Sequence, residues 1–571
     1  MCLHAQNTVT FEPICDKVHE TAPTHVFAPG VEISERHKTI VEASIKLDSH
    51  DRQRCDNCPL RRENLILNNE KSYWRAMHAK AVERQTRLQE EKAELEAKLR
   101  LRERQLYGRK SEKSSGKSET EKPDGDKRPK GQQRGSTGHG RRDYSHLETE
   151  TQILGLPENE RTCSICGLPF EDFPDTEDSE IIEIDVRAHR RIVQRKKYIP
   201  ACRCCPRPGI ICAPAAARVV PKGIFGVSVW VTVLLDKYHF MRPTNRLLED
   251  FRTHNLDLAQ GTLTDGLKAM APIFDPIYEA IVAKNLEEKK WHADETRWYV
   301  FAEIEGKIGY RWYLWVFISE SAVVYILDPS RSAKVPKEHF GENREGLLNV
   351  DRYGAYKSMA KGCDIVLVYC WAHVRRDFLA VSCNWPQHSD WAMQWVASIG
   401  KLYHLNNSRL EVVEQPEKFA ERDEKLRRAV EEMAEKMQTQ RRDENTHYAC
   451  KKVLDSLNNH WSGLTVFVDH PEIAMDNNKA ERQVRGPVVG RKNYYGSGSE
   501  WSGRLAAVLF SIFQTLGLFN LNPRRWLQMY LQACSENTGK APEDIETLLP
   551  WNMTSQRLAE LSFEPVQRDS S

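Results

Sequence analysis

Three carboxylates in this sequence lie in settings that suit metal chemistry. Asp294 interrupts the aromatic run "WHADETRWYVFAEI", Asp351 follows the apolar run "GLLNV", and Glu481 lies in "DNNKAERQVRGPVVGRKN". A carboxylate inside an otherwise buried strand is costly unless it is paired or bound to a metal. Either aspartate alone could pair with an arginine, but two such acids and a third at a helix start favour a metal site. Three carboxylates can bind two Mg²⁺ ions for two-metal phosphoryl transfer.

The surroundings of Glu481 are strongly basic. With Asn478 as N-cap, Glu481 takes the third helical position, where the helix dipole favours a negative charge. A simple helix start is therefore one explanation of this acid. The other is that the helix holds Glu481 towards the metals while nearby cations receive negatively charged phosphates. Those cations are Arg482, Arg485, Arg491 and Lys492.

The elements that must position the acids begin at residue 291. Three runs rich in aromatic and β-branched residues come first, and alternating helix and strand patterns follow. The order strand-strand-strand-helix-strand-helix-strand-helix is that of the ribonuclease H core, an α/β sheet with an antiparallel start. Adjacent strands of this core would bring Asp294 and Asp351 together. The charged helical pattern at 395–445 indicates an insertion within the catalytic domain. The stretch "WSGRLAAVLFSIFQTLGLF" predicts a helix packed behind the site.

A second metal site is predicted upstream of the sheet. Cys163 and Cys166 in "CSICG" and Cys202 and Cys205 in "CRCC" form two C-x-x-C knuckles, the arrangement that structural Zn²⁺ prefers. The segment between them, 180–201, alternates like a pair of strands. Cys204 or Cys212 could replace one of the four ligands, and unliganded buried cysteines are the alternative. Cys55 and Cys58 have the same spacing, with His50 as a possible third ligand, but two free thiols at a helix start fit them better.

The N-terminal part is predicted to contain one long helix. Residues 62–107 lack Pro and Gly, and Leu88, Leu95, Leu99 and Leu106 form a heptad seam that Trp74 and Ala81 extend. Lys92 and Arg102 interrupt this seam, so a dimerising or docking helix is favoured over a perfect coiled coil. Residues 98–143 then contain 15 Lys and Arg against 7 Asp and Glu. This stretch is either a solvated linker or a basic arm that follows phosphates.

Bulk composition sets limits on the whole chain. Its 571 residues imply several domains, and the 83 Lys and Arg nearly cancel the 81 Asp and Glu, so net charge indicates no partner. We find no run of about 18 apolar residues and no signal-peptide pattern, which predicts a cytoplasmic protein without a membrane partner. Fifteen cysteines in such a protein favour thiols and metal sites over disulfides.

Several of these motifs together resemble the DDE transposases of the insertion sequence 66 family. "LYGRKSEK", "GHGRR" with "CSICG", "HADET", "VDRYGAYK", "CWAHVRRDF" and "DNNKAERQVRGPVVGRKN" occur in the family's order between about residues 88 and 532. The resemblance implies that Asp294, Asp351 and Glu481 are the DDE triad. It also implies that His373, Arg375 and Arg376 in "CWAHVRR", together with Asn478, lie near the active site or contact DNA.

The implied reaction is hydrolysis at transposon ends, followed by attack of the exposed 3′-OH groups on target DNA. The resemblance implies two Mg²⁺ (or Mn²⁺) ions per active site, terminal repeats and target DNA as partners, and a homodimer or higher oligomer in the bacterial cytoplasm, associated with the nucleoid. Small accessory transposition proteins are further candidate partners. Two alternatives remain open at this point: a ribonuclease H-fold nuclease that does not join DNA, and a catalytically silent DNA-binding regulator.

The fold class expected is multidomain α/β. The expected parts are a poorly ordered segment (1–61), a coiled-coil helix (62–108), a basic linker (109–145), a zinc-binding element (146–215), a helical DNA-binding domain that could contain a helix-turn-helix (216–288), the first part of the ribonuclease H-like core (289–394), a helical insertion (395–465), the last part of the core with Glu481 (466–534) and a tail (535–571).

Overall fold

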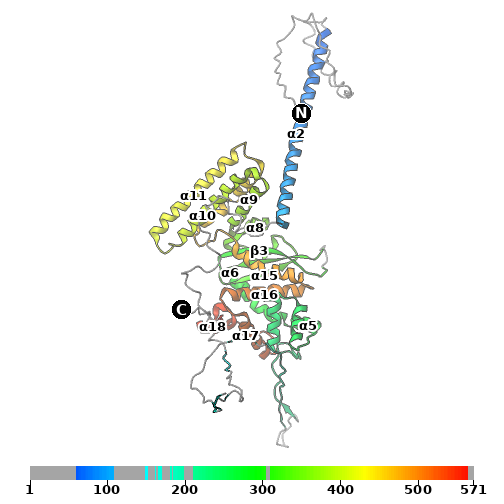
Figure 1. Ribbon diagram of the computed structural model, residues 1–571, viewed down its shortest axis with the longest axis vertical. Helices are drawn as coiled ribbons and strands as arrows, with labels where there is room; N and C mark the ends of the chain where they lie inside the picture. The colour runs from blue at the N-terminus through cyan, green and yellow to red at the C-terminus, as the bar shows by residue number, and fades with distance from the viewer. Residues whose placement is uncertain are drawn as a thin grey trace. The chain divides into compact units, whose positions relative to one another are not determined.

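A computed structural model describes most of the chain. The residues described are 59–107, 148–151, 161, 165–166, 168–169, 181–182, 184, 186–198, 210–303 and 309–563. Outside them lie the predicted linker and the cysteines at 55, 58, 163, 202, 204 and 205. The chain divides into two compact units, Met1–Arg109 and Lys110–Ser571. Figure 1 shows both, and each is described by itself.

The first unit contains the predicted long helix. Helix α2 spans Pro59–Tyr107 without a break, as the absence of Pro and Gly from 62–107 predicts. Leu88, Leu95 and Leu99 on its seam are all exposed. Large apolar side chains at heptad spacing on an exposed face are typical of a helix that pairs with a partner. The coiled coil itself stays a prediction.

A mixed five-stranded sheet forms the centre of the second unit. The strands are β3 (Lys290–Tyr299), β4 (Arg311–Ile318), β5 (Val323–Asp328), β6 (Glu345–Val350) and β7 (Asp364–Tyr369). Their order is β5-β4-β3-β6-β7. Strands β3, β4 and β5 pair antiparallel, whereas β3, β6 and β7 pair parallel. Helices α7 (Lys334–Phe340), α8 (Gly354–Ala360) and α9 (Trp371–Asn384) alternate with the later strands. This is the element order predicted from the sequence.

Helices pack against the sheet along β3, β4 and β5. Helix α15 (Asn478–Tyr494) packs on β3 and β4, while α6 (Asp275–Glu287) and α16 (Glu500–Leu518) pack on β5. Strand β4 is almost completely buried, which explains its continuous apolar sequence. The edge strand β5 is closed by hydroxyl groups of α16: Thr515 Oγ1 accepts the Val323 N–H at 3.0 Å, and Ser511 Oγ accepts the Tyr325 N–H at 2.8 Å. These bonds occupy backbone donors that an edge strand would otherwise expose.

Helices precede the sheet, as predicted. They are α3 (Val227–Leu234), the π-helical turn η3 (Leu235–His239), α4 (Thr244–Thr253), α5 (Gln260–Met270), the 3-10 turn η4 (Ala271–Phe274) and α6. The stretch "RPTNRLLEDFRTHNLDLAQGTLTDGLKAM" predicts two helices joined by a turn, the second capped by Thr262 or Thr264. Helices α4 and α5 are this pair, but the predicted cap is wrong: Ala259 is the N-cap of α5, and Thr264 donates its hydroxyl to the Gln260 carbonyl one turn earlier.

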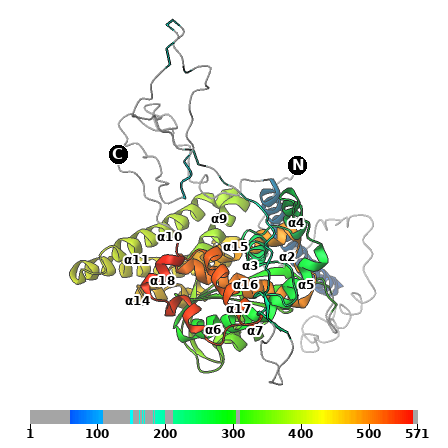
Figure 2. The same ribbon diagram turned by 90° about the horizontal axis from the view of Figure 1, so that it is seen from below.

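The insertion between β7 and α15 is helical. Its elements are the 3-10 turn η5 (Pro386–His388), α10 (Ser389–Leu410), α11 (Pro416–Arg442), α12 (Tyr448–Asn459), α13 (Trp461–Leu464) and α14 (Val466–Asp469). Helices α10 and α11 run side by side and extend away from the sheet (Figures 1 and 2). Arg409 is fully buried between them and donates to the Phe467 and Val468 carbonyls at 2.9 and 2.8 Å. Both Nη atoms also bond to side chains, Nη1 to Asp423 and Nη2 to Asn406, so most of the buried guanidinium is paired.

Two smaller regions differ from expectation. Within 180–201, the described residues form no pair of strands. Instead, β1 (Lys197–Tyr198) pairs antiparallel with β2 (Ile211–Cys212), which follows the "CRCC" segment. The stretch 535–563, expected as a tail, adds α18 (Ser555–Leu561) after α17 (Pro523–Glu536), and it buries Leu549. Among the helices described, we find none with the length and apolar character needed to span a bilayer.

Candidate active site

Strand register brings Asp294 and Asp351 together. Strands β3 and β6 pair in parallel up to His292 opposite Asn349. Asp294 and Asp351 each lie two residues beyond this pair. Side chains two residues apart along a strand point to the same face, so Asp294 and Asp351 lie on one face of the sheet. Asp351 is the first residue after β6, where Oδ1 accepts the Tyr353 N–H at 2.9 Å. Asp294 Oδ1 accepts the Glu295 N–H at 2.8 Å.

Glu481 comes from the first turns of α15. The helix begins at Asn478, and Asn477 is its N-cap residue, so the prediction of Asn478 as N-cap is wrong by one residue. Glu481 is therefore the fourth helical residue, and its N–H makes the first helical bond, to the Asn477 carbonyl at 3.1 Å. The side chain that accepts at the helix start belongs to Asp476, whose Oδ1 receives the Asn478 N–H at 3.1 Å.

Asn477 does not cap the helix with its side chain because that side chain is committed to β3. Its Nδ2 donates to the Ala293 carbonyl at 2.7 Å, and its Oδ1 lies 3.0 Å from His292 Nδ1. Its backbone N–H donates to Cys370 Sγ at 3.2 Å. The residue is 1% exposed. Asn477 thus connects the strand of Asp294, the helix of Glu481 and the residue before α9.

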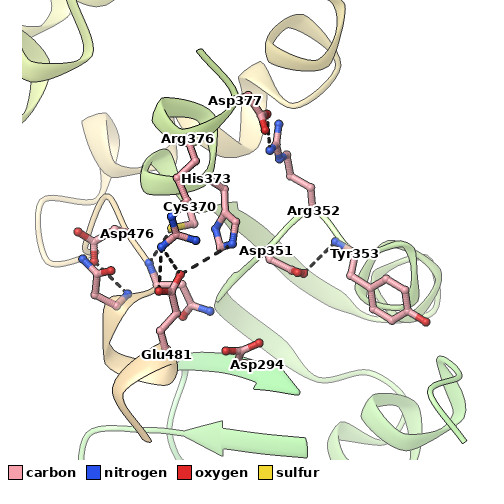
Figure 3. Close-up of polar contacts among 12 residues, drawn as sticks. Asp294, Asp351, Arg352, Tyr353, Cys370, His373, Arg376, Asp377, Asp476 and Glu481 are labelled. Carbon is pink, nitrogen blue, oxygen red and sulfur yellow. Dashed lines mark hydrogen bonds and ion pairs between the residues drawn. The ribbon is translucent and has the colours of Figure 1, made fainter. Parts of the chain in front are cut away.

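The three predicted acids line one cavity. Its volume is about 510 Å³. Figure 3 shows the Glu481 side chain next to those of His373 and Arg376 from α9, with Asp294 and Asp351 nearby. The other lining residues are His373, Arg376, Asn477, Val484, Arg485, Val488, Val489 and Lys492. The acids therefore share one cavity with cations from two helices.

Negative charge in the cavity is only partly compensated. Burial raises the pKa of Asp294 to about 7, and the carboxylates of Glu295, Asp351 and Glu481 act in the same direction. Arg376 pairs with Glu481, at 2.9 Å from Nη2 to Oε2. The largest effect on the Asp294 pKa is burial, and the neighbouring carboxylates add to it. A divalent cation that binds oxygen would offset these negative charges.

His373 lies beside the Arg376–Glu481 pair. Its Nε2 is 3.8 Å from Glu481 Oε1, while its Nδ1 is buried with no hydrogen-bond partner in the described part of the chain. Burial lowers the pKa of His373, and the charge of Arg376 lowers it further. The ligand atoms of Cys370, His373 and Glu481 lie within 4.8 Å of one another. A cation near Glu481 therefore has nitrogen and sulfur donors within reach besides carboxylates.

Comparison with known proteins fits this arrangement. The family model of the IS66 family transposases matches residues 222–505, a range that contains all three acids. The chain belongs to the IS66 transposase family.

Relatives of this family member include three proteins of Sinorhizobium fredii (strain NBRC 101917 / NGR234). Uncharacterized protein y4jD is 27% identical over 72% of this chain and 81% of its own length. Uncharacterized protein y4hP is 23% identical over 71% of this chain and 75% of its own. Uncharacterized protein y4qI is 24% identical over 61% of this chain and 66% of its own length. Membership of a transposase family implies DNA as the partner.

The cations predicted to bind DNA in this IS66 member occupy different settings. Arg485 and Lys492 are exposed and line the cavity, and Arg482 is exposed nearby on α15. Arg491 instead donates to Thr296 Oγ1 at 3.2 Å and to the Arg297 carbonyl, so it joins α15 to β3. Two predicted residues remain. Arg375 on α9 is half-buried, and Asn478 at the start of α15 is exposed.

Glu295 is a cavity neighbour that the sequence analysis missed. Its side chain is 1% exposed, pairs with Arg331 and accepts the Tyr356 hydroxyl at 2.7 Å. Burial raises the pKa of Glu295, whereas Tyr356 and Arg331 lower it. The available signal was the position of this second acid directly after Asp294 in "HADET". Asn477 and Cys370 were also missed, although the first lies in the amide run and the second begins "CWAHVRR".

Proposed function

We propose that this chain is a DNA transposase that cleaves the ends of its insertion sequence and joins the resulting 3′-OH ends to target DNA. The observation that carries this proposal is the meeting of Asp294, Asp351 and Glu481 in one cavity with basic side chains at its wall. The strand order β5-β4-β3-β6-β7 supports a ribonuclease H-like core. The domain boundaries set out from the sequence belong to the same proposal.

The donor set of the cavity fits divalent magnesium. Carboxylate oxygens are the ligands that Mg²⁺ prefers, and Mn²⁺ accepts the same set. Asp294, Asp351 and Glu481 would hold the ions, and a bound cation would offset the burial and the neighbouring carboxylates that raise the pKa of Asp294. The chemistry supplied by two such ions is activation of the attacking oxygen and stabilisation of the leaving oxygen.

The remaining residues would bind and orient the substrate. Arg485 and Lys492, both in the cavity wall, would hold phosphates beside the acids. Arg376 holds Glu481 through a bidentate contact, at 3.1 and 2.9 Å from Nη2 to the two carboxylate oxygens. This contact fixes the Glu481 rotamer before DNA enters. Upstream, we propose that Cys163, Cys166, Cys202 and Cys205 hold a structural Zn²⁺.

The test is a joining assay with the full chain. Labelled end DNA, a target plasmid and Mg²⁺ should give both cleaved ends and covalently joined products. Asp294→Asn, Asp351→Asn and Glu481→Gln should each reduce cleavage by at least about 1,000-fold while end binding stays near wild type, because only the charge at the metal site changes. Asp364→Asn, an exposed acid at the start of β7, is the matched control and should remain active.

Three results would overturn the proposal in different ways. Strand transfer by any variant of the three acids would remove those residues from the active site. Cleavage without joined products would identify a nuclease. Absence of cleavage together with absence of Mg²⁺ or Mn²⁺ binding in a metal titration would identify a silent DNA-binding regulator.

A further inference from the structure

A second cluster of metal-binding side chains lies in the helical insertion, outside the cavity of the three acids. The ligand atoms of His388, His447 and Cys450 lie within 4.8 Å of one another. His388 ends η5, directly after α9, whereas His447 is the N-cap of α12 and Cys450 lies in its first turn. We propose that these three residues form a transition-metal site, suited to Zn²⁺, that joins the end of α9 to the start of α12.

The donor types select the metal. Two imidazole nitrogens and one thiolate sulfur are ligands of Zn²⁺, whereas Mg²⁺ prefers oxygen. Bond lengths of about 2.0 Å to nitrogen and 2.3 Å to sulfur place tetrahedral ligand atoms roughly 3.3–3.6 Å apart. Closing the cluster therefore needs movements of about 1 Å, which side-chain rotation can supply. Binding would release the Cys450 thiol proton to solvent.

The surrounding contacts hold the three side chains in place. The rings of His388 and His447 pack with centroids 4.4 Å apart and their planes tilted by 34°, and the ring of Trp385 packs against His447 at 4.9 Å. Ser382 and Ser389 share a hydroxyl hydrogen bond of 2.8 Å across the turn that carries His388. Cys450 is buried, but both histidines are half-buried, so an ion can reach them from solvent. His447 Nδ1 also accepts the Ala449 N–H, at a long distance of 3.3 Å.

The position of the site gives it a structural consequence. Helix α9 carries His373 and Arg376 near its start, and its end leads into His388. A metal bound at the far end would fix α9 against α12 and so brace the insertion on the helix that contacts Glu481. This inference does not depend on the transposase activity, because it concerns metal content and stability.

The experiment measures zinc bound to the full chain. Wild-type protein is saturated with Zn²⁺, freed of excess by gel filtration and analysed by atomic emission. Cys450→Ser and His388→Asn should each lose about one zinc per chain. Cys363→Ser, which changes a half-buried thiol outside the cluster, should lose none. A double variant, Cys163→Ser with Cys166→Ser, tests the proposed upstream zinc separately. When it is combined with Cys450→Ser, the protein should lose the zinc of both sites.

A stability readout keeps the test decisive if a variant folds poorly. In the Cys163→Ser, Cys166→Ser background, added Zn²⁺ should raise the thermal midpoint, and a chelator should reverse the rise. Adding Cys450→Ser to that background should abolish the response. Zinc contents of Cys450→Ser and His388→Asn equal to that of Cys363→Ser would overturn the proposal. A thermal midpoint in the background variant that does not respond to Zn²⁺ would overturn it as well.

Discussion

Asp294 carries an electrostatic cost in the folded protein, because burial and three neighbouring carboxylates all oppose its charge. Its pKa of about 7, against an ordinary value of 3.8, means that the folded protein binds this proton more tightly than the unfolded chain does. The associated stability is complete below about pH 4 and is lost as the pH rises through about 7. Each pKa unit corresponds to roughly 1.4 kcal/mol, so the loss reaches about 4 kcal/mol at most.

This shift predicts a pH-dependent difference between wild type and Asp294→Asn. In chelator, the free energy of unfolding of the wild type should fall relative to that of the variant between about pH 4 and 7, and the variant should be the more stable protein at pH 8. Added Mg²⁺ should narrow the gap at pH 8 by stabilising only the wild type. Urea titrations across this pH range give the comparison, and identical pH profiles for both proteins would contradict it.

Single residues also show what sequence can and cannot reveal. Asp294 and Asp351 stand out because an acid in an apolar strand needs a partner, and that argument is local. The role of Asn477 depends on contacts with Ala293 and Cys370, which lie more than a hundred residues away, so its amide in "DNN" gives no such signal. The one-residue error in the cap has the same origin: the Asn477 side chain bonds to β3 rather than to its own helix.

At the scale of elements, the site depends on how α15 is fixed to β3. Two contacts do this near opposite ends of the helix: Asn477 with Ala293 at the start, and Arg491 with Thr296 towards the end. Between them lies Glu481. A rigid attachment matters because a carboxylate displaced by about 1 Å loses much of its catalytic value.

Asn477→Ala should therefore separate Glu481 from the other acids. Loss of the amide leaves the buried Ala293 carbonyl and the His292 ring without their partner, which costs roughly 1–3 kcal/mol of stability for each unsatisfied group. Cleavage should fall more than the folded fraction does, and Asn477→Gln should not restore it, since the longer side chain does not fit the same bonds. Asn407→Ala, which changes an exposed amide on α10, is the control. Equal activity of the two alanine variants would contradict this role.

Element order was predictable because it follows from local patterns. The aromatic and β-branched runs at 291–328 became β3, β4 and β5, and the two later strand-helix patterns became β6 with α8 and β7 with α9. The insertion boundary was set at 395, whereas the helices of the insertion begin at Ser389. The alternation in 180–201 misled because β2, the partner of β1, lies at Ile211–Cys212, beyond the predicted segment.

At the scale of the whole molecule, DNA binding should be governed by cations at the cavity. Arg485→Ala and Lys492→Ala should weaken binding to all sequences alike and reduce the slope of log affinity against log salt by roughly 0.9 per lost phosphate contact. Arg491→Ala should mainly lower stability, because its guanidinium bonds to β3. Arg557→Ala on α18, where the arginine pairs with Glu560, is the charge-matched control. Fluorescence anisotropy from low to moderate salt measures the slopes, and unchanged slopes for Arg485→Ala and Lys492→Ala would refute their role.

Assembly should depend on α2. Leu95 and Leu99 are 64% and 59% exposed, which is unfavourable unless a partner helix covers them. Leu95→Asp with Leu99→Asp should shift the protein from dimers or larger oligomers to monomers in sedimentation velocity, while the second unit keeps its unfolding midpoint. Glu90→Gln, on the exposed surface of the same helix, should leave the oligomeric state unchanged. A monomeric wild type at micromolar concentration would rule out this role of α2.

The chain runs through 129 residues between Asp351 and Glu481, the helical insertion among them, and α16, which covers the sheet edge, follows later still. During synthesis, strands β3 to β7 leave the ribosome well before α15 and α16 can dock on them. A nascent or prematurely terminated chain therefore carries two of the three acids without the third. On the proposed function, DNA cleavage should therefore appear only once the C-terminal helices have been released, and a chain that ends before α15 should not cut DNA.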